Sequence, residues 1–368
     1  MHRIEAERQC ILLCVTGSRM YHLHTESSDY DYRGILLRPT SDYLSFDSFE
    51  QKDKGWDTEE GLDIAPFNNL SKDTVLYDIR KYLTLAQKGN PNILELLFAD
   101  EYLYLTPVGK SLIEQRHLFL SQACKKSYVG YAYSQMHRIQ TRRRWLLDPV
   151  INRPEPSDFG FNDTYKITSK EELFAFCEFL FDCVKRKLIF FEPVESFHRL
   201  LFEDLDFKAL FKTELFEEEG VSVVSQITGT PVNYIHQLQN SKRYYQAIRD
   251  YENYQAWLKN RNPERAEMEA KTGYDVKHAT HCLRLLYQAF YIFTEQTLII
   301  NVNHFPKGES DYIRLVKAGQ VKYEDLLQKT EDLFNLIKNM NIKTFRSPLS
   351  NTELSEIFKR LLLLNESQ

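Results

Sequence analysis

The 368-residue chain has few cysteines and lacks a long apolar run. The cysteines contain no CxxC pair, so the sequence indicates neither a zinc site nor a disulfide framework; they are Cys10, Cys14, Cys124, Cys177, Cys183 and Cys282. No apolar stretch approaches the roughly 18 residues needed to span a bilayer. The start Met-His-Arg-Ile-Glu is unlike a signal peptide. We therefore expect a cytoplasmic protein with no membrane partner.

A strong positive charge is also missing. The formal net charge is −5, which argues against a protein that coats nucleic acid through a broadly basic surface. One local basic cluster follows three tyrosines in a segment with helical spacing: Tyr128, Tyr131, Tyr133, Arg138, Arg142, Arg143 and Arg144. Arginines beside aromatic rings suit an RNA backbone and its bases. They equally suit a solvated helix end, and the sequence leaves both interpretations open.

The most informative segment runs from Ile11 to Gly34. An apolar strand, Ile11 to Val15, leads directly into Gly17-Ser18-Arg19. A strand that runs into a Gly-Ser turn at a helix start directs free backbone N–H groups at an anion, and the helix dipole adds to the attraction. The pattern predicts a phosphate site at Gly17 and Ser18.

Two carboxylates follow Ser18 after a spacer of ten residues. Asp29 and Asp31 are separated by one residue, and alternation along a strand would place them on one face. Such a pair suits a divalent metal ion that neutralises charge on phosphate oxygens. The alternative is that both are solvated turn residues.

A third carboxylate would complete a site for two metal ions. The strand-like segment 73–78 offers Asp73 and Asp78, which fall on opposite faces, so only one can join the site. We favour Asp73, because Asp78 is equally well placed to cap a helix over 79–88. The choice between the two remains open at this point, and Asp57 and Asp63 are less favoured because they lie in a polar loop.

Motifs spread over the chain resemble a known family. They are Gly17-Ser18-Arg19-x-Tyr21, Ser28-Asp29-x-Asp31-x-Arg33-Gly34, Asp73-x-x-x-Tyr77-x-x-Arg80-Lys81, Asn90-Pro91, Glu95-Leu96-Leu97 and Gly273-Tyr274-Asp275-x-Lys277-His278-Ala279-x-His281-x-x-Arg284-Leu285-Leu286. This order resembles nucleotidyltransferases of the DNA polymerase β superfamily, and within them the RNA repair pathway DNA polymerase β family. One departure is His22, where members of the family often carry glycine.

The resemblance implies an α+β fold. A polymerase-β-type catalytic domain at 1–115, a small mixed sheet with flanking helices, would precede a mainly helical domain at 116–368 that closes over nucleotide and acceptor. The sequence pattern agrees with strands at 11–15, 34–37 and 74–77 and helices at 79–88 and 93–98. It also predicts helices around 121–146, 170–190, 241–260, 275–299 and 321–340. The tract 191–235 has no clear pattern beyond a strand-like Val-Ser-Val-Val.

The same resemblance assigns the site residues. Asp29, Asp31 and Asp73 would be catalytic and hold two Mg²⁺ or Mn²⁺ ions, while Gly17, Ser18, Arg19 and Arg33 would bind the nucleoside triphosphate. Arg33 is as well explained as a salt-bridge partner of the acidic strand. Lys277, His281 and Arg284 share one helix face and form a plausible wall for a triphosphate, although surface cations would show the same spacing.

The expected activity is transfer of a nucleoside monophosphate from an NTP to an acceptor hydroxyl, with an RNA 3′ end as the acceptor that the family implies. Two alternatives remain. The enzyme would modify a protein partner in a toxin–antitoxin or defence setting, or the chain would be a non-catalytic nucleotide-binding module. The sequence gives neither the NTP nor the oligomeric state.

Overall fold

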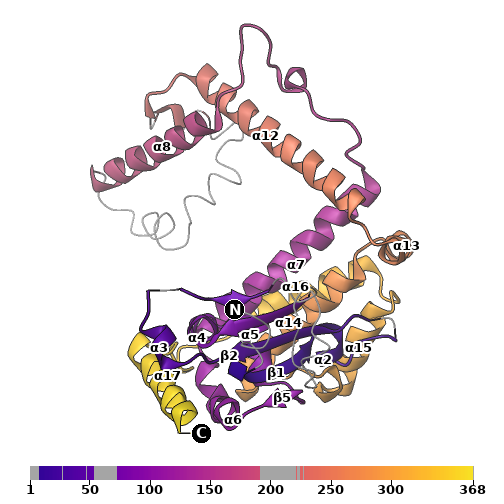
Figure 1. Cartoon of the computed structure of the whole chain (residues 1–368). Coiled ribbons are helices and arrows are strands. Elements are labelled where there is room, and N and C mark those ends of the chain that lie inside the picture. The colour runs from indigo at the N-terminus through magenta and orange to yellow at the C-terminus, as the bar shows by residue number, and fades with distance from the viewer. Residues whose placement is uncertain are drawn as a thin grey trace. The chain divides into compact units, whose positions relative to one another are not determined.

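The computed structural model describes residues 8–26, 28–46, 48–53, 73–190, 221, 224–226 and 228–367 (Figure 1). It is an α+β protein with a small mixed sheet near the N-terminus followed by helices. The chain divides into two compact units, Met1–Leu146 with Pro263–Gln368, and Leu147–Asn262. Residues 263–368 thus belong to the same unit as the sheet, whereas the division drawn from the sequence separates them at residue 115.

The five-stranded sheet has the order β3-β4-β2-β1-β5. Its strands are β1 (Cys10–Thr16), β2 (Asp31–Leu36), β3 (Gln51–Lys52), β4 (Thr74–Asp78) and β5 (Tyr104–Leu105). β1 pairs antiparallel with β2 and β5, and β3 pairs antiparallel with β4. The central β2–β4 pair is parallel, so both strands begin at the same edge of the sheet.

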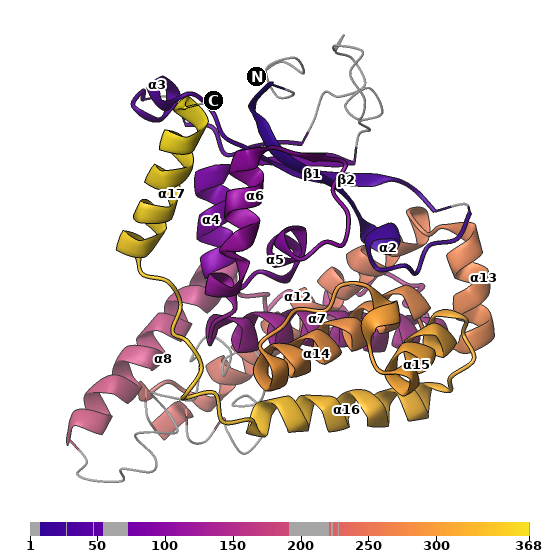
Figure 2. The ribbon, with the colours of Figure 1, turned by 90° about the horizontal axis from the view of Figure 1, so that it is seen from below.

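The two faces of the sheet are covered differently. Leu12 and Ile35 belong to the large core, which also includes side chains from α4, α5 and α14. Leu13 and Leu36 point to the opposite face, where a smaller apolar cluster lies. Figure 2 shows α4, α5 and α6 on one side of β1 and β2. Because side chains alternate along β2, Asp31 and Arg33 share the helix-covered face with Ile35.

The remaining helices of this unit surround the large core. They are α2 (Gly17–Met20), α3 (Thr40–Tyr43), α4 (Ile79–Gln87), α5 (Pro91–Leu97), α6 (Pro107–Glu114), η2 (Arg116–Phe119), α7 (Ala123–Leu147), α13 (Pro263–Thr272), α14 (Val276–Glu295), η4 (Val302–His304), α15 (Lys307–Lys317), α16 (Tyr323–Asn339) and α17 (Asn351–Glu366). α14 is central, since most of its residues are buried and its N-cap Asp275 accepts from the backbone N–H groups of Lys277 and His278.

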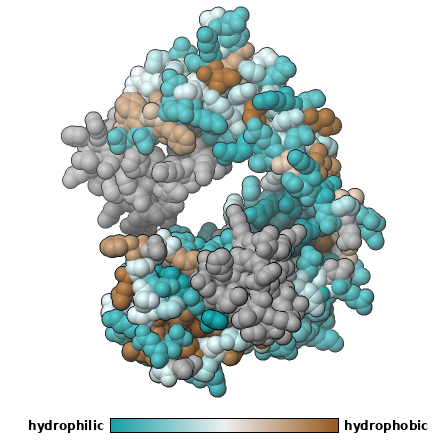
Figure 3. Space-filling model, in the orientation of Figure 1, coloured by the Kyte–Doolittle hydropathy of each residue, from teal (hydrophilic) through white to brown (hydrophobic). Residues whose placement is uncertain are grey.

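The second unit contains η3 (Pro156–Phe159), α8 (Lys170–Phe190) and α12 (Val232–Lys259). Leu180 of α8 packs with Ile235 and Leu238 of α12 in a small apolar cluster. Several large apolar side chains remain exposed here, among them Ile151 and Phe174. On the face shown in Figure 3, hydrophobic residues of this unit form separate spots in a mostly hydrophilic surface.

Most elements predicted from the sequence are present within one to three residues of their expected ends. The exceptions are α14, which ends four residues before the predicted residue 299, and α12, which begins nine residues before the helix predicted from 241. Val221 and Val224 are helical, so the strand-like interpretation of that piece is wrong, while residues 191–220 lie outside the described part of the chain. Among the described residues, no helix is long and apolar enough to cross a membrane.

Candidate active site

Asp31 and Asp73 occupy equivalent places on two neighbouring parallel strands. Tyr32 of β2 and Thr74 of β4 are partners in the ladder, and the two aspartates come immediately before this pair. They therefore meet at the edge where both strands begin. Asp73 is exposed and Asp31 is half-buried, so the edge is open to solvent.

The Gly-Ser turn lies against the same edge. Gly17 has a φ of +67°, a region that favours glycine. A Cβ atom on Gly17 would also collide with Oδ2 of Asp31. The site therefore needs glycine for two reasons, and the backbone of the predicted phosphate turn approaches the Asp31 carboxylate closely.

The turn differs from the expected helix start in one respect. α2 is only one turn long, from Gly17 to Met20, because the chain leaves it at Tyr21 and enters the loop toward β2. A four-residue helix sums few peptide dipoles, so the electrostatic attraction expected from the helix is small. The Ser18 side chain makes no hydrogen bond to a described residue.

Asp29 lies in a loop rather than on the strand. β1 pairing ends at Thr16, opposite Asp31, so residues 29 and 30 have no ladder partner. Arg19 ties this loop down: its Nη2 donates to the Ser28 carbonyl at 2.7 Å and its Nε to the Asp29 carbonyl at 3.3 Å. Its guanidinium also stacks 3.6 Å from the ring centre of Tyr30. Arg19 thus holds Asp29 close to Asp31 by backbone contacts.

Asp31 is the electrostatic centre of the site. Partial burial raises its pKa, and the carboxylates of Asp73 and Asp29 raise it further. Arg33, on the same strand face, and Lys277 of α14 oppose this shift. Four charged residues from three segments of the chain therefore act on one carboxylate, and three carboxylates gather there at a mutual electrostatic cost.

The donor set suits a hard divalent cation. Mg²⁺ prefers oxygen ligands and is commonly held by one or two carboxylates together with substrate phosphates, not by a complete protein cage. Among the described residues, no three His, Cys, Asp or Glu side chains are gathered tightly enough to hold a metal ion by themselves. The mutual repulsion around Asp31 is what a bound cation would relieve.

Asp78 has a structural environment at the other end of β4. It is 1% exposed, and its carboxylate accepts from the Arg80 backbone N–H at 2.9 Å as the N-cap of α4. The second oxygen accepts from Arg38 Nε at 3.2 Å and from Tyr43 Oη at 3.0 Å. These contacts give Asp78 a structural role, and they explain its burial without a catalytic function.

The start of α14 brings a lysine to the site. Lys277 is close enough to Asp31 and Asp29 for their charges to act on its pKa, which partial burial and Arg265 lower. Its ammonium makes no hydrogen bond to a described side chain. The next residue, His278, turns toward α7 instead, with Nδ1 2.7 Å from Gln135 Oε1.

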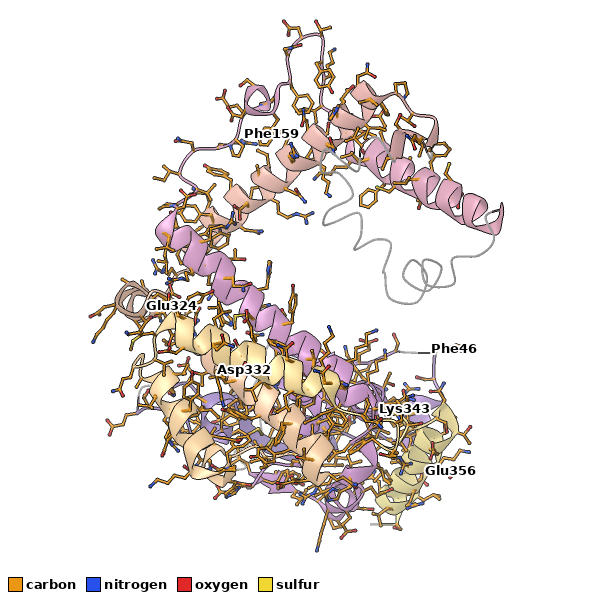
Figure 4. All side chains as sticks on the ribbon, turned by 180° about the vertical axis from the view of Figure 1, so that it is seen from behind. Phe46, Phe159, Glu324, Asp332, Lys343 and Glu356 are labelled. Atoms are coloured by element: carbon orange, nitrogen blue, oxygen red, sulfur yellow. The ribbon has the colours of Figure 1, made fainter. Side chains whose placement is uncertain are left out.

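Residues of the basic cluster on α7 anchor this helix end. Arg142 pairs with the buried Asp275, and Arg143 donates to the Gly273 carbonyl at 2.9 Å. Arg143 also lies 3.5 Å from Glu324, which Figure 4 labels on α16. These two arginines therefore have structural partners.

His281 and Arg284 lie deeper on the same helix. Arg284 is 1% exposed and pairs with Glu95 of α5, which is equally buried. The guanidinium is thus enclosed by protein, and a direct nucleotide contact of Arg284 has no support in this geometry. Sequence reasoning gave Glu95 no role, although a lone acid in the apolar stretch Ile93–Phe98 was a signal.

His22 carries the departure from the family pattern. Its φ is +54°, the left-handed region in which glycine is favoured. Its backbone N–H donates to the Arg19 carbonyl at 3.1 Å. The turn therefore keeps the backbone shape that glycine suits, and the histidine carries the strain.

The part of the chain that contains the turn and the carboxylates matches a known family. Residues 1–147 match the model of the RNA repair pathway DNA polymerase beta family. The match contains the Gly-Ser turn, all three carboxylates and Glu95, and it confirms the resemblance for this part of the chain. The block at 273–286 lies beyond it. No curated protein and no solved structure matches the chain.

Proposed function

We propose that this protein is a metal-dependent nucleotidyltransferase with a polymerase-β-type catalytic domain. The observation that carries the proposal is the meeting of Asp29, Asp31 and Asp73 around the Gly17 turn, within residues that match the family. Phosphoryl-type transfer asks little covalent chemistry of a protein and depends on positioning and charge neutralisation.

Each residue then has a part in the reaction. Asp29, Asp31 and Asp73 would hold one or two Mg²⁺ or Mn²⁺ ions, which when bound would neutralise the phosphates of an NTP and orient an acceptor hydroxyl. Gly17 and Ser18 would contact the phosphates through their backbone and the free hydroxyl. Arg19 keeps Asp29 in place, and Lys277 covers phosphate charge from α14.

Arg33 has two open roles in this scheme. Its guanidinium makes no hydrogen bond or ion pair with a described side chain, yet it lowers the pKa of Asp31. It would stabilise the ionised carboxylate before the nucleotide binds and turn to a phosphate afterwards. We also propose that His281 contacts the nucleotide. Arg284, which lies 2.7 Å from His281, would hold the imidazole in position.

The acceptor that we propose is an RNA 3′ end, as the family's name suggests. The test incubates the protein with each α-phosphate-labelled NTP, Mg²⁺, total RNA and a cell extract. Label in RNA supports the proposal, and label in a protein band supports protein modification instead. An Asp31→Asn variant should lose the label, whereas Asp332→Asn, an exposed residue on α16 (Figure 4) whose carboxylate accepts from Gln328, is the charge-matched control. No transfer to either acceptor by folded wild-type protein would refute enzymatic function.

A further inference from the structure

A buried polar network lies behind the Gly-Ser turn. Tyr21, the residue that ends α2, donates from its hydroxyl to Glu95 Oε2 at 2.6 Å. Glu95 Oε1 pairs with Arg284 Nη1, and the Arg284 guanidinium stacks 3.6 Å from the ring centre of Tyr21. The Tyr21 carbonyl accepts from the Val302 backbone N–H at 3.1 Å. The turn is thus fastened from both sides to α5 and to the segment after α14.

The pair of charges at its centre is costly to bury. Glu95 and Arg284 are each 1% exposed, and removing two charges from water is repaid only when their remaining donors and acceptors are satisfied. Arg284 meets this condition, because Nη1 also donates to Gln288 Oε1 at 3.0 Å and Nη2 lies 2.7 Å from His281 Nδ1. Apolar side chains could fill the same space without burying two charges, so packing alone does not explain this network.

The contact with His281 fixes the state of its ring. A guanidinium can only donate, so Nδ1 of His281 must accept and the ring proton must reside on Nε2. Burial lowers the pKa of His281 to about 2, and the neighbouring charges of Arg284, Lys277 and Arg138 lower it as well. His278 adds to the same effect. His281 is therefore a neutral imidazole with its N–H directed away from Arg284.

His281 and Lys277 lie on one face of α14. His281 follows Lys277 by four residues on α14 and so lies one turn further along the same face. Lys277 is within electrostatic reach of Asp31 and Asp29. A neutral N–H donor beside Lys277 can bind a phosphate oxygen, and because it carries no charge it does not repel the lysine ammonium.

We propose that Glu95 and Arg284 are positioning residues that fix His281 as a neutral Nε2–H donor to a phosphate oxygen of the bound nucleotide. Tyr21 connects the same pair to the Gly17-Ser18 turn, so the network joins the two elements that would contact phosphate. The inference rests on the proposed function for its ligand, but the state of the His281 ring exists without any ligand.

The first test therefore needs no nucleotide. Nitrogen chemical shifts of the full chain labelled with ¹⁵N-histidine report the tautomer of each imidazole, and His281→Gln assigns the signal. We expect the neutral Nε2–H form of His281 from about pH 5.5 to about pH 8, and a mixed population in Glu95→Gln. A charged ring or the Nδ1–H form in the wild type would overturn the proposal, whatever the activity.

The second test measures binding of a non-hydrolysable NTP analogue with Mg²⁺ by calorimetry. The glutamine amide reaches the position of Nε2–H and the asparagine amide that of Nδ1–H, so His281→Gln should bind within about threefold of the wild type and His281→Asn about tenfold more weakly. Equal affinity of both folded variants would overturn the donor role. If the wild type binds no NTP, the proposed function and the phosphate ligand fail together, while the tautomer measurement stands.

Coupling between the residues separates positioning from mere stability. Glu95→Gln should weaken binding about tenfold in the wild type but add little in His281→Asn, because the same hydrogen bond is already lost. Circular dichroism and thermal unfolding establish that each variant is folded. Additive losses would show that Glu95 acts independently of His281.

Discussion

Asp73 raises the pKa of Asp31 across the parallel pair of β2 and β4. The two carboxylates stand at the edge where both strands begin, and the Gly17 turn approaches Asp31 closely from the other side. The folded chain therefore gathers like charges at Asp31, and their effect on its pKa is opposed by Arg33 and Lys277. We regard this stored repulsion as the physical basis of cation binding.

Asp31 gives a pH dependence with a defined sign. Its pKa is raised in the folded state, so the folded protein holds the proton more tightly and the free energy of unfolding falls as pH rises through the range from the ordinary value toward the raised one. Asp31→Asn should remove this slope and raise the melting temperature of the metal-free protein. Saturating Mg²⁺ should stabilise the wild type more than the variant. Thermal unfolding between about pH 3.5 and about pH 6 checks this, and a variant less stable than the wild type without metal would contradict it.

The two candidate third carboxylates should behave oppositely. Asp73→Asn should abolish transfer and leave the free energy of unfolding nearly unchanged, because Asp73 is exposed. Asp78→Ala breaks a buried ion pair with Arg38 and should lower the free energy of unfolding by roughly 3–5 kcal/mol. Urea unfolding measures both. A stable Asp78→Ala protein without activity would instead place Asp78 in the site.

Gly17→Ala tests the close approach of the turn to Asp31. It combines left-handed strain with a collision against Oδ2, so it should lower both stability and turnover. Gly160→Ala is the matched control, since Gly160 has a φ of +79° and open space at its Cβ position. The control should lose only about 1 kcal/mol of stability. If both variants lost the same stability and Gly17→Ala kept its turnover, the close approach of the turn to Asp31 would have no consequence.

His22→Gly should stabilise the protein. Its φ of +54° costs a non-glycine residue roughly 1–2 kcal/mol, which exceeds the roughly 0.5–1 kcal/mol that glycine loses in backbone entropy. A gain below about 1 kcal/mol is therefore expected in urea unfolding. His24→Gly, two residues on and without positive φ, should not stabilise. A destabilised His22→Gly protein would mean that the imidazole makes a contact worth more than the strain.

Sequence reasoning could propose this site because its motifs are local. The turn at Gly17, the acids at 29 and 31 and the strand after Asp73 are each short patterns, and pairing of β2 with β4 brings them together. It placed Asp29 on a strand because period-2 alternation carries no information about where ladder pairing ends, which here is Thr16.

The interior of the site was harder to predict. Lys277, His281 and Arg284 share a helix face, but spacing does not tell how deep each residue lies, and Arg284 is enclosed by Glu95 and Tyr21. That pairing joins residues almost 190 positions apart. The placement of α13 to α17 beside the sheet likewise follows from core packing between distant segments, which no local pattern reports.

Lys277→Ala should weaken binding of an NTP analogue by about 1–3 kcal/mol, the range for a charge-assisted hydrogen bond. Lys329→Ala, on α16, where its ammonium lies 5.9 Å from the ring centre of Tyr287, is the control for loss of a positive charge. Calorimetry with Mg²⁺ present compares them. Unchanged affinity of Lys277→Ala would exclude Lys277 from the nucleotide site.

The central claim is tested most directly by transfer of α-phosphate label from an NTP under single-turnover conditions, with Asp31→Asn compared to the wild type. The account predicts transfer that requires Mg²⁺ or Mn²⁺ and falls by about 10³-fold or more in the variant, since removing a metal-held charge costs several kcal/mol of transition-state stabilisation. A folded Asp31→Asn protein that transfers label at the wild-type rate would contradict it.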